Sequence, residues 1–344
     1  NPVIGFRSFG EDPDNVARKG AAYALAMQNN GVLPSMKHFP GHGNTVTDSH
    51  HALPIVKNSL EEINKIELVP FKYLIDNGVK GAMVGHLYFP ALEPVVNKSS
   101  SLSKNIVTDL LRDEMNYDGI IFTDGLEMKA AYNGIDPDSV CLQAIMAGND
   151  IMLLPIDVEA SMQIVIDAAK NNPDVKNRVE ESCKKILRYK YQLGLNNYEL
   201  QSVERLNNDL HQSRYYNLKQ RLYNEAVTML VNKKNILPLK KNNDKKIAVV
   251  TFGKDNSISK RLNDNGIENT PFLLNKDASS EEMKRTAKQL KSYYYVVLNI
   301  RNTSSYPSKN YGITPAMISF VDNISNSTKL IFNLFGSPYA VDKF

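Results

Sequence analysis

Short apolar runs that end in polar residues alternate along the first part of the chain with longer stretches whose apolar positions recur at helical spacing. This alternation is typical of parallel βα units, in which each strand is followed by a helix that packs on the sheet. We expect strands at 31–37, 81–86, 119–124 and 149–154. We expect helices at 15–30, 59–76, 103–114, 138–147, 158–170 and 175–192. The pattern therefore predicts an α/β fold with four strand–helix repeats.

A second set of apolar runs follows a polar stretch at 193–220, which predicts a linker with helical pieces. The runs beyond Leu222 predict a second α/β layer domain. Its expected strands are 246–250, 294–299 and 329–334, and its expected helices lie near 280–291 and 314–326. The domain limits that follow are 1–195, 196–221 for the linker, and 222–344, with the last domain stopping short of its natural end.

The bulk composition describes an ordinary globular protein. A length of 344 residues suggests two domains or one large barrel, and 42% hydrophobic with 23% charged residues supplies ample material for a core. The net charge is only +4, and no motif interleaves basic with aromatic residues, so we expect no nucleic-acid partner. No apolar run approaches the ~20 residues of a transmembrane segment. Cys141 and Cys183 lack CxxC spacing, so we expect buried free thiols.

Four of the six histidines in the protein lie between positions 38 and 51. A proline and two glycines near His42 favour a loop, which the preceding apolar run would deliver from the carboxyl end of a strand. In α/β proteins that end of the strand usually carries the chemistry. The histidines and Asp48 are legitimate metal ligands, but their spacing matches no H-E-x-x-H type of motif, so we expect no metal.

Several segments carry a resemblance to a known family. KHFPGHGNTVTDSHHALP, which begins at Lys37, resembles the signature of family 3 glycoside hydrolases in the β-N-acetylglucosaminidase (NagZ-type) branch. The resemblance implies a catalytic (β/α)8 TIM-type barrel, of which residues 1–195 would form the second half. It implies that a C-terminal α/β sandwich domain follows, entered through EAVTMLVNKKNILPL. The chain would then be cropped at both ends, with the missing N-terminal half-barrel supplied by the rest of the same protein.

Asp124 is the candidate nucleophile of this expected site. Cleaving a glycosidic bond with retention requires a carboxylate that attacks the anomeric carbon of the sugar. Asp124 ends the third expected strand, and the family's nucleophile lies in a segment that resembles FTDGLEM at 122–128. The alternative is an aspartate that caps the next helix.

Asp48 and His50 are the candidate acid/base pair. A histidine titrates near neutrality, so it can both donate a proton to the leaving oxygen and accept one from water. A neighbouring carboxylate would hold the imidazole in one tautomer. In the NagZ-type branch the DSH segment has this role, whereas most other branches use a carboxylate from elsewhere. The alternative is a surface Asp–His pair.

Arg7, Lys37 and His38 are candidates for binding the sugar. Lys37 and His38 would follow the first strand and donate hydrogen bonds to sugar hydroxyls. Arg7 lies in RSFGEDP, which resembles the segment with the family's sugar-contacting arginine. Arg7 could instead form an ion pair with Glu11 or Asp12.

Three further residues have two interpretations each. Met128 could form the floor of the sugar site or belong to the core. His42, which lies between glycines, is expected to shape the loop rather than to touch the sugar. His86 ends the second expected strand, where it could line the pocket or be a core histidine with all of its hydrogen bonds made.

The resemblance implies a retaining exo-β-N-acetylglucosaminidase that acts on terminal β-linked GlcNAc, with peptidoglycan fragments as the expected source and no cofactor. The alternatives are a family 3 β-glucosidase or broad β-glycosidase, a GlcNAc phosphorylase, and a non-catalytic glycan-binding protein. The sequence leaves the cellular compartment open, with the periplasm or cell envelope and the cytoplasm of a bacterium as the options.

Overall fold

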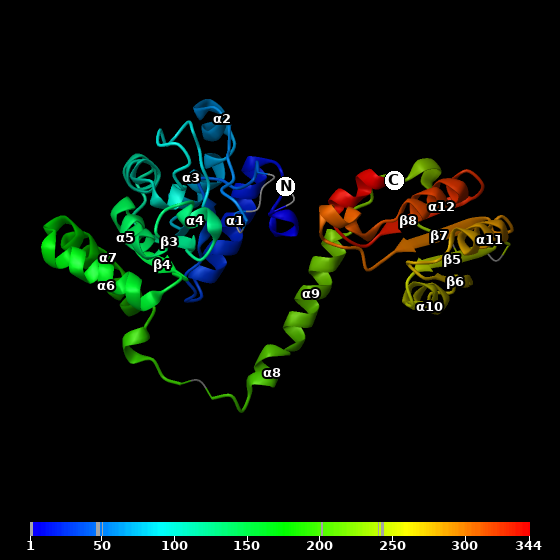
Figure 1. Cartoon of the computed structure of the whole chain (residues 1–344). Coiled ribbons are helices and arrows are strands. Elements are labelled where there is room, and N and C mark those ends of the chain that lie inside the picture. The colour runs from blue at the N-terminus through cyan, green and yellow to red at the C-terminus, as the bar shows by residue number, and fades with distance from the viewer. Residues whose placement is uncertain (1–2, 46–48, 50, 201, 240, 242–243) are drawn as a thin grey trace. The chain divides into compact units, whose positions relative to one another are not determined.

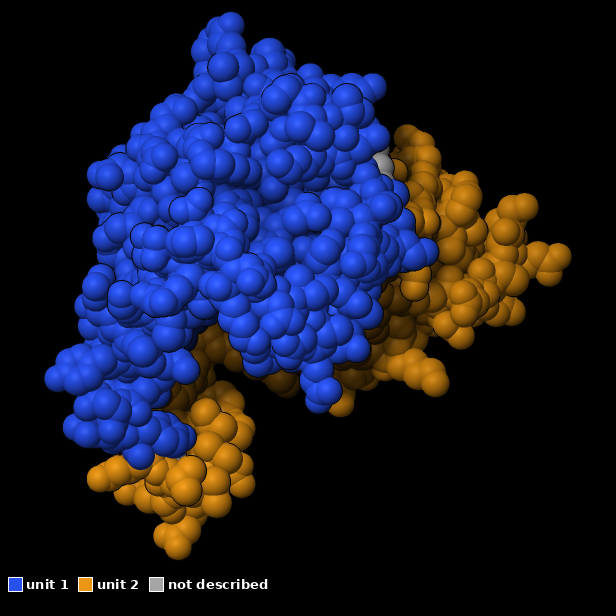
Figure 2. Space-filling model, turned by 60° about the vertical axis from the view of Figure 1, so that its left-hand side comes forward, with its two compact units in different colours: residues 1–198 blue, residues 199–344 orange. Residues whose placement is uncertain are grey.

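The computed structural model describes residues 3–45, 49, 51–200, 202–239, 241 and 244–344 (Figure 1). The chain forms two compact units, residues 1–198 and 199–344, which Figure 2 shows in separate colours. Each unit has its own parallel sheet and its own hydrophobic core. The parallel sheets confirm the predicted α/β class, whereas the domain limits derived from the sequence stay a prediction.

The first unit is built on a sheet of four parallel strands in the order β1-β2-β3-β4. The strands are β1 (Met36–Phe39), β2 (Gly81–Val84), β3 (Ile120–Gly125) and β4 (Ile151–Leu153). Phe39 pairs with Val84, and Val84 pairs with Thr123. The carboxyl ends of β1, β2 and β3 therefore meet at one edge of the sheet.

The helices of this unit alternate with the strands and begin where the sequence supplies capping groups. Asp12 accepts a hydrogen bond from the N–H of Asn15 before α1, and Ser59 forms a reciprocal capping box with Glu62 before α2. The α-helices are α1 (Pro13–Gln28), α2 (Leu60–Lys65), α3 (Leu68–Asp76), α4 (Lys129–Tyr132), α5 (Pro137–Ala147), α6 (Val158–Asn171) and α7 (Pro173–Gln192). The remaining helical segments are the 3-10 helices η1 (Gly5–Arg7), η2 (Ser100–Leu102) and η4 (Leu195–Asn197) and the π-helix η3 (Asn105–Glu114).

The core of the first unit is a cluster of buried side chains from β1, β2, α3 and η3. Phe39 of β1 meets Phe71 of α3 edge to face, with ring centroids 5.2 Å apart. Burying a large apolar side chain stabilises the fold by about 1.5–3 kcal/mol. Packing of this kind therefore holds the helices, and with them the register of the strands, in place.

Two predictions about local structure are wrong. The strand predicted at 31–37 begins only at Met36, so Lys37 and His38 lie within β1 rather than after it. Pro34 has no N–H to give to a ladder, which explains the late start. The helix predicted at 59–76 is two helices, α2 and α3, because the ring of Pro70 would clash with the carbonyl of Ile66 in a continuous helix.

Two smaller differences concern the fourth strand and a cysteine. The strand predicted at 149–154 is limited to 151–153, and the side chains of Asn149 and Asp150 just before it make buried hydrogen bonds. Leu154 has a φ of 50°, which ends the extended backbone. Cys141 is a buried free thiol as predicted, but Cys183 is exposed.

The second unit contains a four-stranded parallel sheet in the order β6-β5-β7-β8. Its strands are β5 (Ile247–Phe252), β6 (Thr270–Leu274), β7 (Tyr295–Ile300) and β8 (Lys329–Leu334). Its helices are α10 (Ser257–Asp264), α11 (Ser280–Leu290) and α12 (Pro315–Ser325), together with the 3-10 helices η5 (Lys233–Asn235), η6 (Pro307–Gly312) and η7 (Pro338–Lys343).

Two elements of this unit, β6 and α10, were not predicted from the sequence. β6 is an edge strand that contains Pro271 and is mostly exposed, so it lacks the continuous apolar run of its neighbours.

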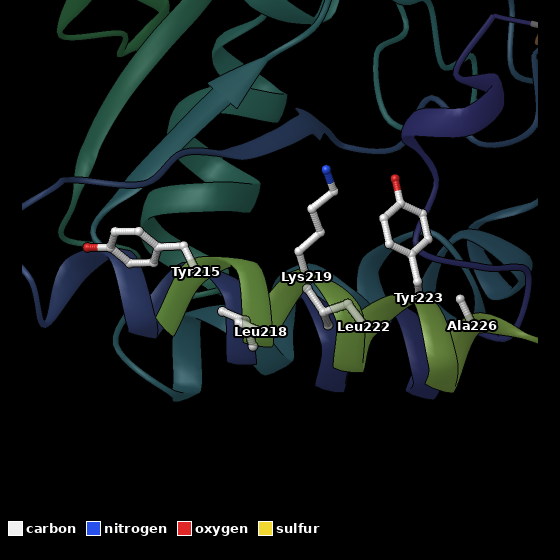
Figure 3. A pocket seen from close by; sticks show the side chains of 6 residues that line it. All are labelled: Tyr215, Leu218, Lys219, Leu222, Tyr223 and Ala226. Carbon is white, nitrogen blue, oxygen red and sulfur yellow. The ribbon is translucent and has the colours of Figure 1, made fainter. Parts of the chain in front are cut away.

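Two helices, α8 (Leu206–Leu210) and α9 (Ser213–Ala226), precede the second sheet and bury none of their residues. One face of α9 lines a shallow pocket, which Figure 3 shows from close by. The lining residues are Tyr215, Leu218, Lys219, Leu222, Tyr223 and Ala226. Throughout the described ranges, no helix combines the length and apolarity that crossing a bilayer requires.

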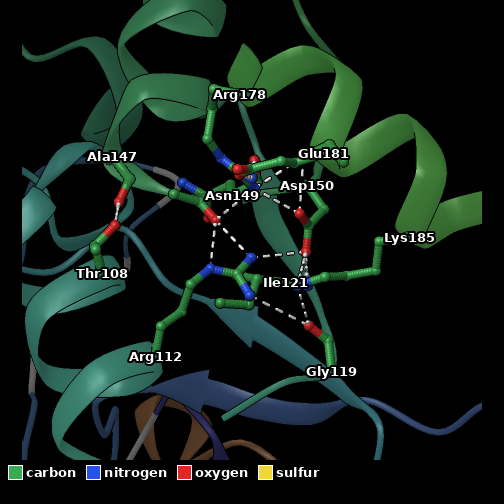
Figure 4. A network of polar contacts seen from close by, with 12 residues as sticks. Thr108, Arg112, Gly119, Ile121, Ala147, Asn149, Asp150, Arg178, Glu181 and Lys185 are labelled. Atoms are coloured by element: carbon green, nitrogen blue, oxygen red, sulfur yellow. Dashed lines mark hydrogen bonds and ion pairs between the residues drawn. The ribbon is translucent and has the colours of Figure 1, made fainter. Parts of the chain in front are cut away.

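A buried carboxylate ties β4 to two helices at the amino ends of the strands (Figure 4). The side chain of Asp150 has no exposed surface, and its oxygens lie 2.7 Å from Arg112 Nη2 of η3 and 2.6 Å from Arg178 Nη2 of α7. Its Oδ2 also accepts a hydrogen bond of 3.0 Å from the N–H of Ile121, and its Oδ1 accepts one of 2.7 Å from Ser182. Each arginine also donates to the carbonyl of Gly148.

The surrounding charges decide the state of this carboxyl group. Burial by itself raises the pKa of Asp150, but the positive charges of Arg112 and Lys185 and the hydrogen bonds from Ile121 and Ser182 lower it below its usual value. Asp150 is therefore a charged group held inside the protein by its partners. Removing one partner of such a buried set leaves the others uncompensated, which costs about 3–5 kcal/mol.

Replacing Asp150 with asparagine in the full-length protein should lower the free energy of unfolding by about 3 kcal/mol, because two largely buried guanidinium groups lose their counter-charge. Unfolding in guanidinium chloride measures this change. Asp113→Asn, at an exposed position of η3, is the matched control and should stay within about 0.5 kcal/mol of the wild type. Equal stabilities for the two variants would show that the network contributes nothing.

Candidate active site

The carboxyl ends of β1 and β3 bring an imidazole and a carboxylate together. Nε2 of His38 lies 3.7 Å from Oδ2 of Asp124, and the two side chains are 9% and 20% exposed. The other oxygen of Asp124 accepts a hydrogen bond of 2.9 Å from the N–H of Gly125. Asp124 caps no helix, since α4 begins at Lys129 with Met128 as its N-cap residue. The carboxylate is thus oriented by its own turn and keeps one oxygen facing the imidazole.

His38 is neutral at physiological pH although it lies within ion-pair distance of a carboxylate. Burial lowers the pKa of His38 to about 3; the charge of Asp124 opposes this shift, and the nearby Lys37, His42 and Arg7 side chains add to it. The neutral ring keeps one N–H donor and one acceptor. A neutral donor beside a carboxylate can bind a sugar hydroxyl without cancelling the negative charge of Asp124.

The histidine loop, defined here as residues 40–51, packs tightly at its start. A side chain at Gly41 would place its Cβ 2.8 Å from the side chain of Glu67, and Gly41 has a φ of +146°, so only glycine fits. Oγ1 of Thr45 lies 2.6 Å from Nδ1 of His42, and both residues are buried. His42 also meets His38 edge to face, with ring centroids 5.6 Å apart.

Two side-chain hydrogen bonds link this loop to Glu67, the residue directly before α3. The amide of Asn44 donates to Oδ1 of Asn58 at 2.8 Å, and the amide of Asn58 donates to Oε1 of Glu67 at 3.3 Å. Burial raises the pKa of Glu67, and within the described ranges its Oε2 has no hydrogen-bond partner. Neither Glu67 nor Asn58 was predicted from the sequence. The one available signal was an acidic residue directly before the apolar start of α3, where an acid is also expected simply to stabilise the end of the helix.

The remaining predicted residues differ in their exposure and contacts. Arg7 is exposed on η1 and donates a hydrogen bond to the carbonyl of Val3; among the described residues it forms no ion pair with Glu11 or Asp12. Lys37 is exposed on β1. Met128 is 6% exposed, and its N–H donates to the carbonyl of Gly125 at 3.1 Å. The structure therefore brings His38 and Asp124 together and places Met128 against the same turn.

Asp48 and His50, the predicted acid/base pair, lie outside the described residues. Their neighbour Ser49 is described and is 4% exposed. In the described part of the chain, no group of three or more His, Cys, Asp or Glu side chains is arranged to hold a metal ion.

His86 is completely buried just beyond β2 and makes hydrogen bonds on both sides of its ring. Nε2 lies 2.9 Å from the carbonyl oxygen of Gly125, and Nδ1 lies 2.8 Å from Oγ of Ser101. Of the two interpretations that the sequence left open, the structure therefore supports a core histidine whose polar atoms are paired. The sequence could not reveal the two partners, which lie 39 and 15 residues away.

The fold and this edge define an α/β protein with a partly exposed carboxylate and a neutral imidazole at the carboxyl ends of β3 and β1, two parallel strands on either side of β2. The profile described as "Glycosyl hydrolase family 3 N terminal domain" matches residues 1–189. Since the match covers more than half of the chain, the chain belongs to glycosyl hydrolase family 3. This confirms the resemblance on which the sequence-based interpretation was built.

The chain is similar to several named proteins. A protein named "Beta-hexosaminidase A" from Pseudoalteromonas piscicida is 33% identical over 261 residues, which are 70% of this chain and 43% of that protein. A "Beta-hexosaminidase" from Pseudomonas aeruginosa (strain LESB58) is 36% identical over 166 residues, or 48% of each chain. The solved structure of a glycoside hydrolase family 3 β-N-acetylglucosaminidase from Paenibacillus sp. str. FPU-7 is 27% identical with a TM-score of 0.76, covering 100% of this chain and 66% of that chain. The chain thus spans about half the length of the curated relatives it matches.

The low pKa of His38 predicts that its ring does not titrate near neutrality. Between pH 5 and pH 8 the imidazole chemical shifts of His38 in the full-length protein should stay constant, because the ring protonates only as the pH falls toward about 3. NMR of protein labelled at histidine, with a His38→Gln variant to assign the signal, measures this. A titration midpoint between pH 6 and pH 7 would contradict the buried, neutral state.

Proposed function

We propose that the full-length protein is a retaining exo-β-N-acetylglucosaminidase that releases terminal β-linked GlcNAc, with peptidoglycan fragments as the source of the substrate. Membership of glycosyl hydrolase family 3 and similarity to proteins named β-hexosaminidase support this proposal. The single observation that carries it is the position of Asp124. Asp124 lies near the carboxyl end of β3 beside a neutral imidazole, and the N–H of Gly125 orients one oxygen of its carboxylate.

Asp124 is the proposed nucleophile. Its carboxylate oxygen forms a bond to the anomeric carbon while the bond between that carbon and the leaving oxygen breaks, which yields a glycosyl-enzyme. Water then attacks the same carbon from the opposite face and returns the carboxylate. Oδ2 suits this attack because no hydrogen bond occupies it in the described residues: the 3.7 Å to His38 Nε2 is too long for one.

His50, oriented by Asp48, is the proposed acid and base. The imidazolium gives its proton to the departing oxygen in the first step, and the neutral ring takes a proton from the attacking water in the second. This assignment rests on the DSH segment of the sequence, since both residues lie outside the described ranges.

Arg7, Lys37 and His38 are the proposed sugar-binding residues. The positive charge of Arg7 lies close enough to His38 to lower the pKa of that ring, which supports placing both beside one pocket. The neutral His38 ring can exchange hydrogen bonds with a hydroxyl, and the two cations can only donate. Met128, packed on the turn after Asp124, is proposed to lie under the sugar.

The four parallel strands of the first unit are proposed to be half of a closed (β/α)8 barrel, and the second unit a C-terminal α/β sandwich domain. A closed barrel needs eight strands, and the sheet of the first unit has four. Coverage of only 66% of the Paenibacillus enzyme leaves room for the other strands in the rest of the protein. The proposed activity therefore belongs to the full-length protein.

Asp124→Ala in the full-length protein should lower the release of 4-nitrophenol from its β-GlcNAc glycoside by about 10³-fold or more, because no glycosyl-enzyme can form. Asp118→Ala, which removes an exposed aspartate just before the same strand, should stay within about twofold of the wild type. Wild-type release by the Asp124 variant would refute the assigned nucleophile.

The substrate should be a β-GlcNAc glycoside rather than a β-glucoside. We expect kcat/KM to be about 10²-fold higher for the 4-nitrophenyl β-GlcNAc glycoside than for the β-glucoside, since a site that binds the acetamido group loses those contacts with glucose. The same assay in phosphate buffer should yield free GlcNAc. A preference for the glucoside would indicate a β-glucosidase, and GlcNAc 1-phosphate as the product would indicate a phosphorylase.

A further inference from the structure

The buried His86 faces the backbone that carries the nucleophile. Its Nε2 lies 2.9 Å from the carbonyl oxygen of Gly125, the residue directly after Asp124. A carbonyl oxygen only accepts hydrogen bonds, so the proton of this contact is on Nε2 of His86. The side chain is 0% exposed, so no solvent competes for the bond.

The other side of the ring is fixed just as firmly. Nδ1 lies 2.8 Å from the hydroxyl of Ser101, which is also 0% exposed. In the neutral ring Nδ1 is an acceptor, and the Ser101 hydroxyl donates to it. The carbonyl of Ser101 in turn accepts a hydrogen bond of 2.8 Å from the amide of Asn149, which lies just before β4. These contacts select the tautomer that presents an N–H to Gly125.

Gly125 links this buried network to the carboxylate. Its N–H donates to Oδ1 of Asp124 at 2.9 Å, and its carbonyl accepts from both His86 and the N–H of Met128. The peptide groups on either side of Gly125 are therefore both fixed. A shift of this residue would move the donor that orients the Asp124 carboxylate.

We propose that His86 is a positioning residue for Asp124. Its hydrogen bond to the Gly125 carbonyl holds the Asp124 carboxylate in the orientation needed for attack, and His86 itself does not touch the sugar. The inference rests on the proposed role of Asp124 as nucleophile. Displacing a reacting group by about 1 Å can cost on the order of 10²-fold in rate. Losing the His86 contact should therefore slow the attack much more than it weakens substrate binding.

Three variants of the full-length protein test the proposal. His86→Leu keeps a buried side chain of similar size without a donor, and His86→Gln restores an N–H donor that can reach the Gly125 carbonyl. Thr108→Val is the matched control, because it removes a side-chain hydrogen bond of 2.7 Å to a different backbone carbonyl, that of Ala147 (Figure 4). Each is assayed on the aryl β-glycoside that the wild type cleaves fastest.

The expected result is a split between the two kinetic constants. His86→Leu should lower kcat by about 10-fold to 100-fold and change KM by less than about threefold, while His86→Gln should recover kcat to within about fivefold of the wild type. Thr108→Val should keep the wild-type kcat. A kcat for His86→Leu within twofold of the wild type, or equal losses for the leucine and glutamine variants, would overturn the proposal.

A second measurement needs no activity at all. Hydrogen exchange of a peptide covering residues 120–128 should speed up in His86→Leu and stay close to wild type in His86→Gln. If the exchange responds in this way but Asp124→Ala remains active, the proposed nucleophile fails and the link between His86 and the Gly125 turn stands. If the exchange is unchanged in His86→Leu, the positioning role itself fails.

Discussion

The parallel register of β1, β2 and β3 is the constraint on which the site depends. Phe39 pairs with Val84, and Val84 pairs with Thr123, so the carboxyl-terminal parts of three strands distant in sequence come together at one edge. Side chains alternate between the faces of a sheet, and a slip of one residue would turn Asp124 to the opposite face from the one it now occupies. The 3.7 Å between His38 and Asp124 is a direct consequence of this pairing. The packed core around Phe39 and Phe71 keeps the register fixed.

The buried and the reactive carboxylates lie at opposite ends of the strands of this sheet. At the amino ends, the Asp150 side chain is fully buried and bound by several partners, so it joins β4 to η3 and α7. At the carboxyl ends, Asp124 stays partly exposed and keeps one oxygen without a hydrogen bond in the described residues. Both oxygens of the carboxylate that serves stability are thus engaged by partners, whereas one oxygen of the carboxylate proposed for chemistry is left able to react. Separation of stability and catalysis between the two ends of the strands is a general property of barrels built from βα units.

Much of the fold could be predicted from the sequence because its signals are local. The helix expected from 59 does begin after Ser59, which Glu62 caps, whereas the helix expected from 15 begins two residues earlier, at Pro13 after Asp12. The break between α2 and α3 was equally readable from Pro70, but the apolar spacing on both sides concealed it. The edge strand β6 could not be found, since its mostly exposed residues follow the pairing with β5 rather than a pattern of their own.

The site was predictable only in part, for a physical reason. The end of an apolar run showed that Asp124 would sit at the edge of a sheet, but nothing local could show which histidine faces it. That depends on register, and the neutral state of His38 depends on burial that forms only in the folded protein. The partners of His86 were likewise set by tertiary packing.

The most direct test of the account is to trap the covalent intermediate on the full-length protein. A fluorinated β-GlcNAc glycoside with a good leaving group slows the second step, so that the glycosyl-enzyme accumulates. Peptide mass spectrometry then locates the sugar. We expect one adduct, on Asp124; an adduct on a different residue, or steady turnover with no adduct, would contradict the role of Asp124 as nucleophile.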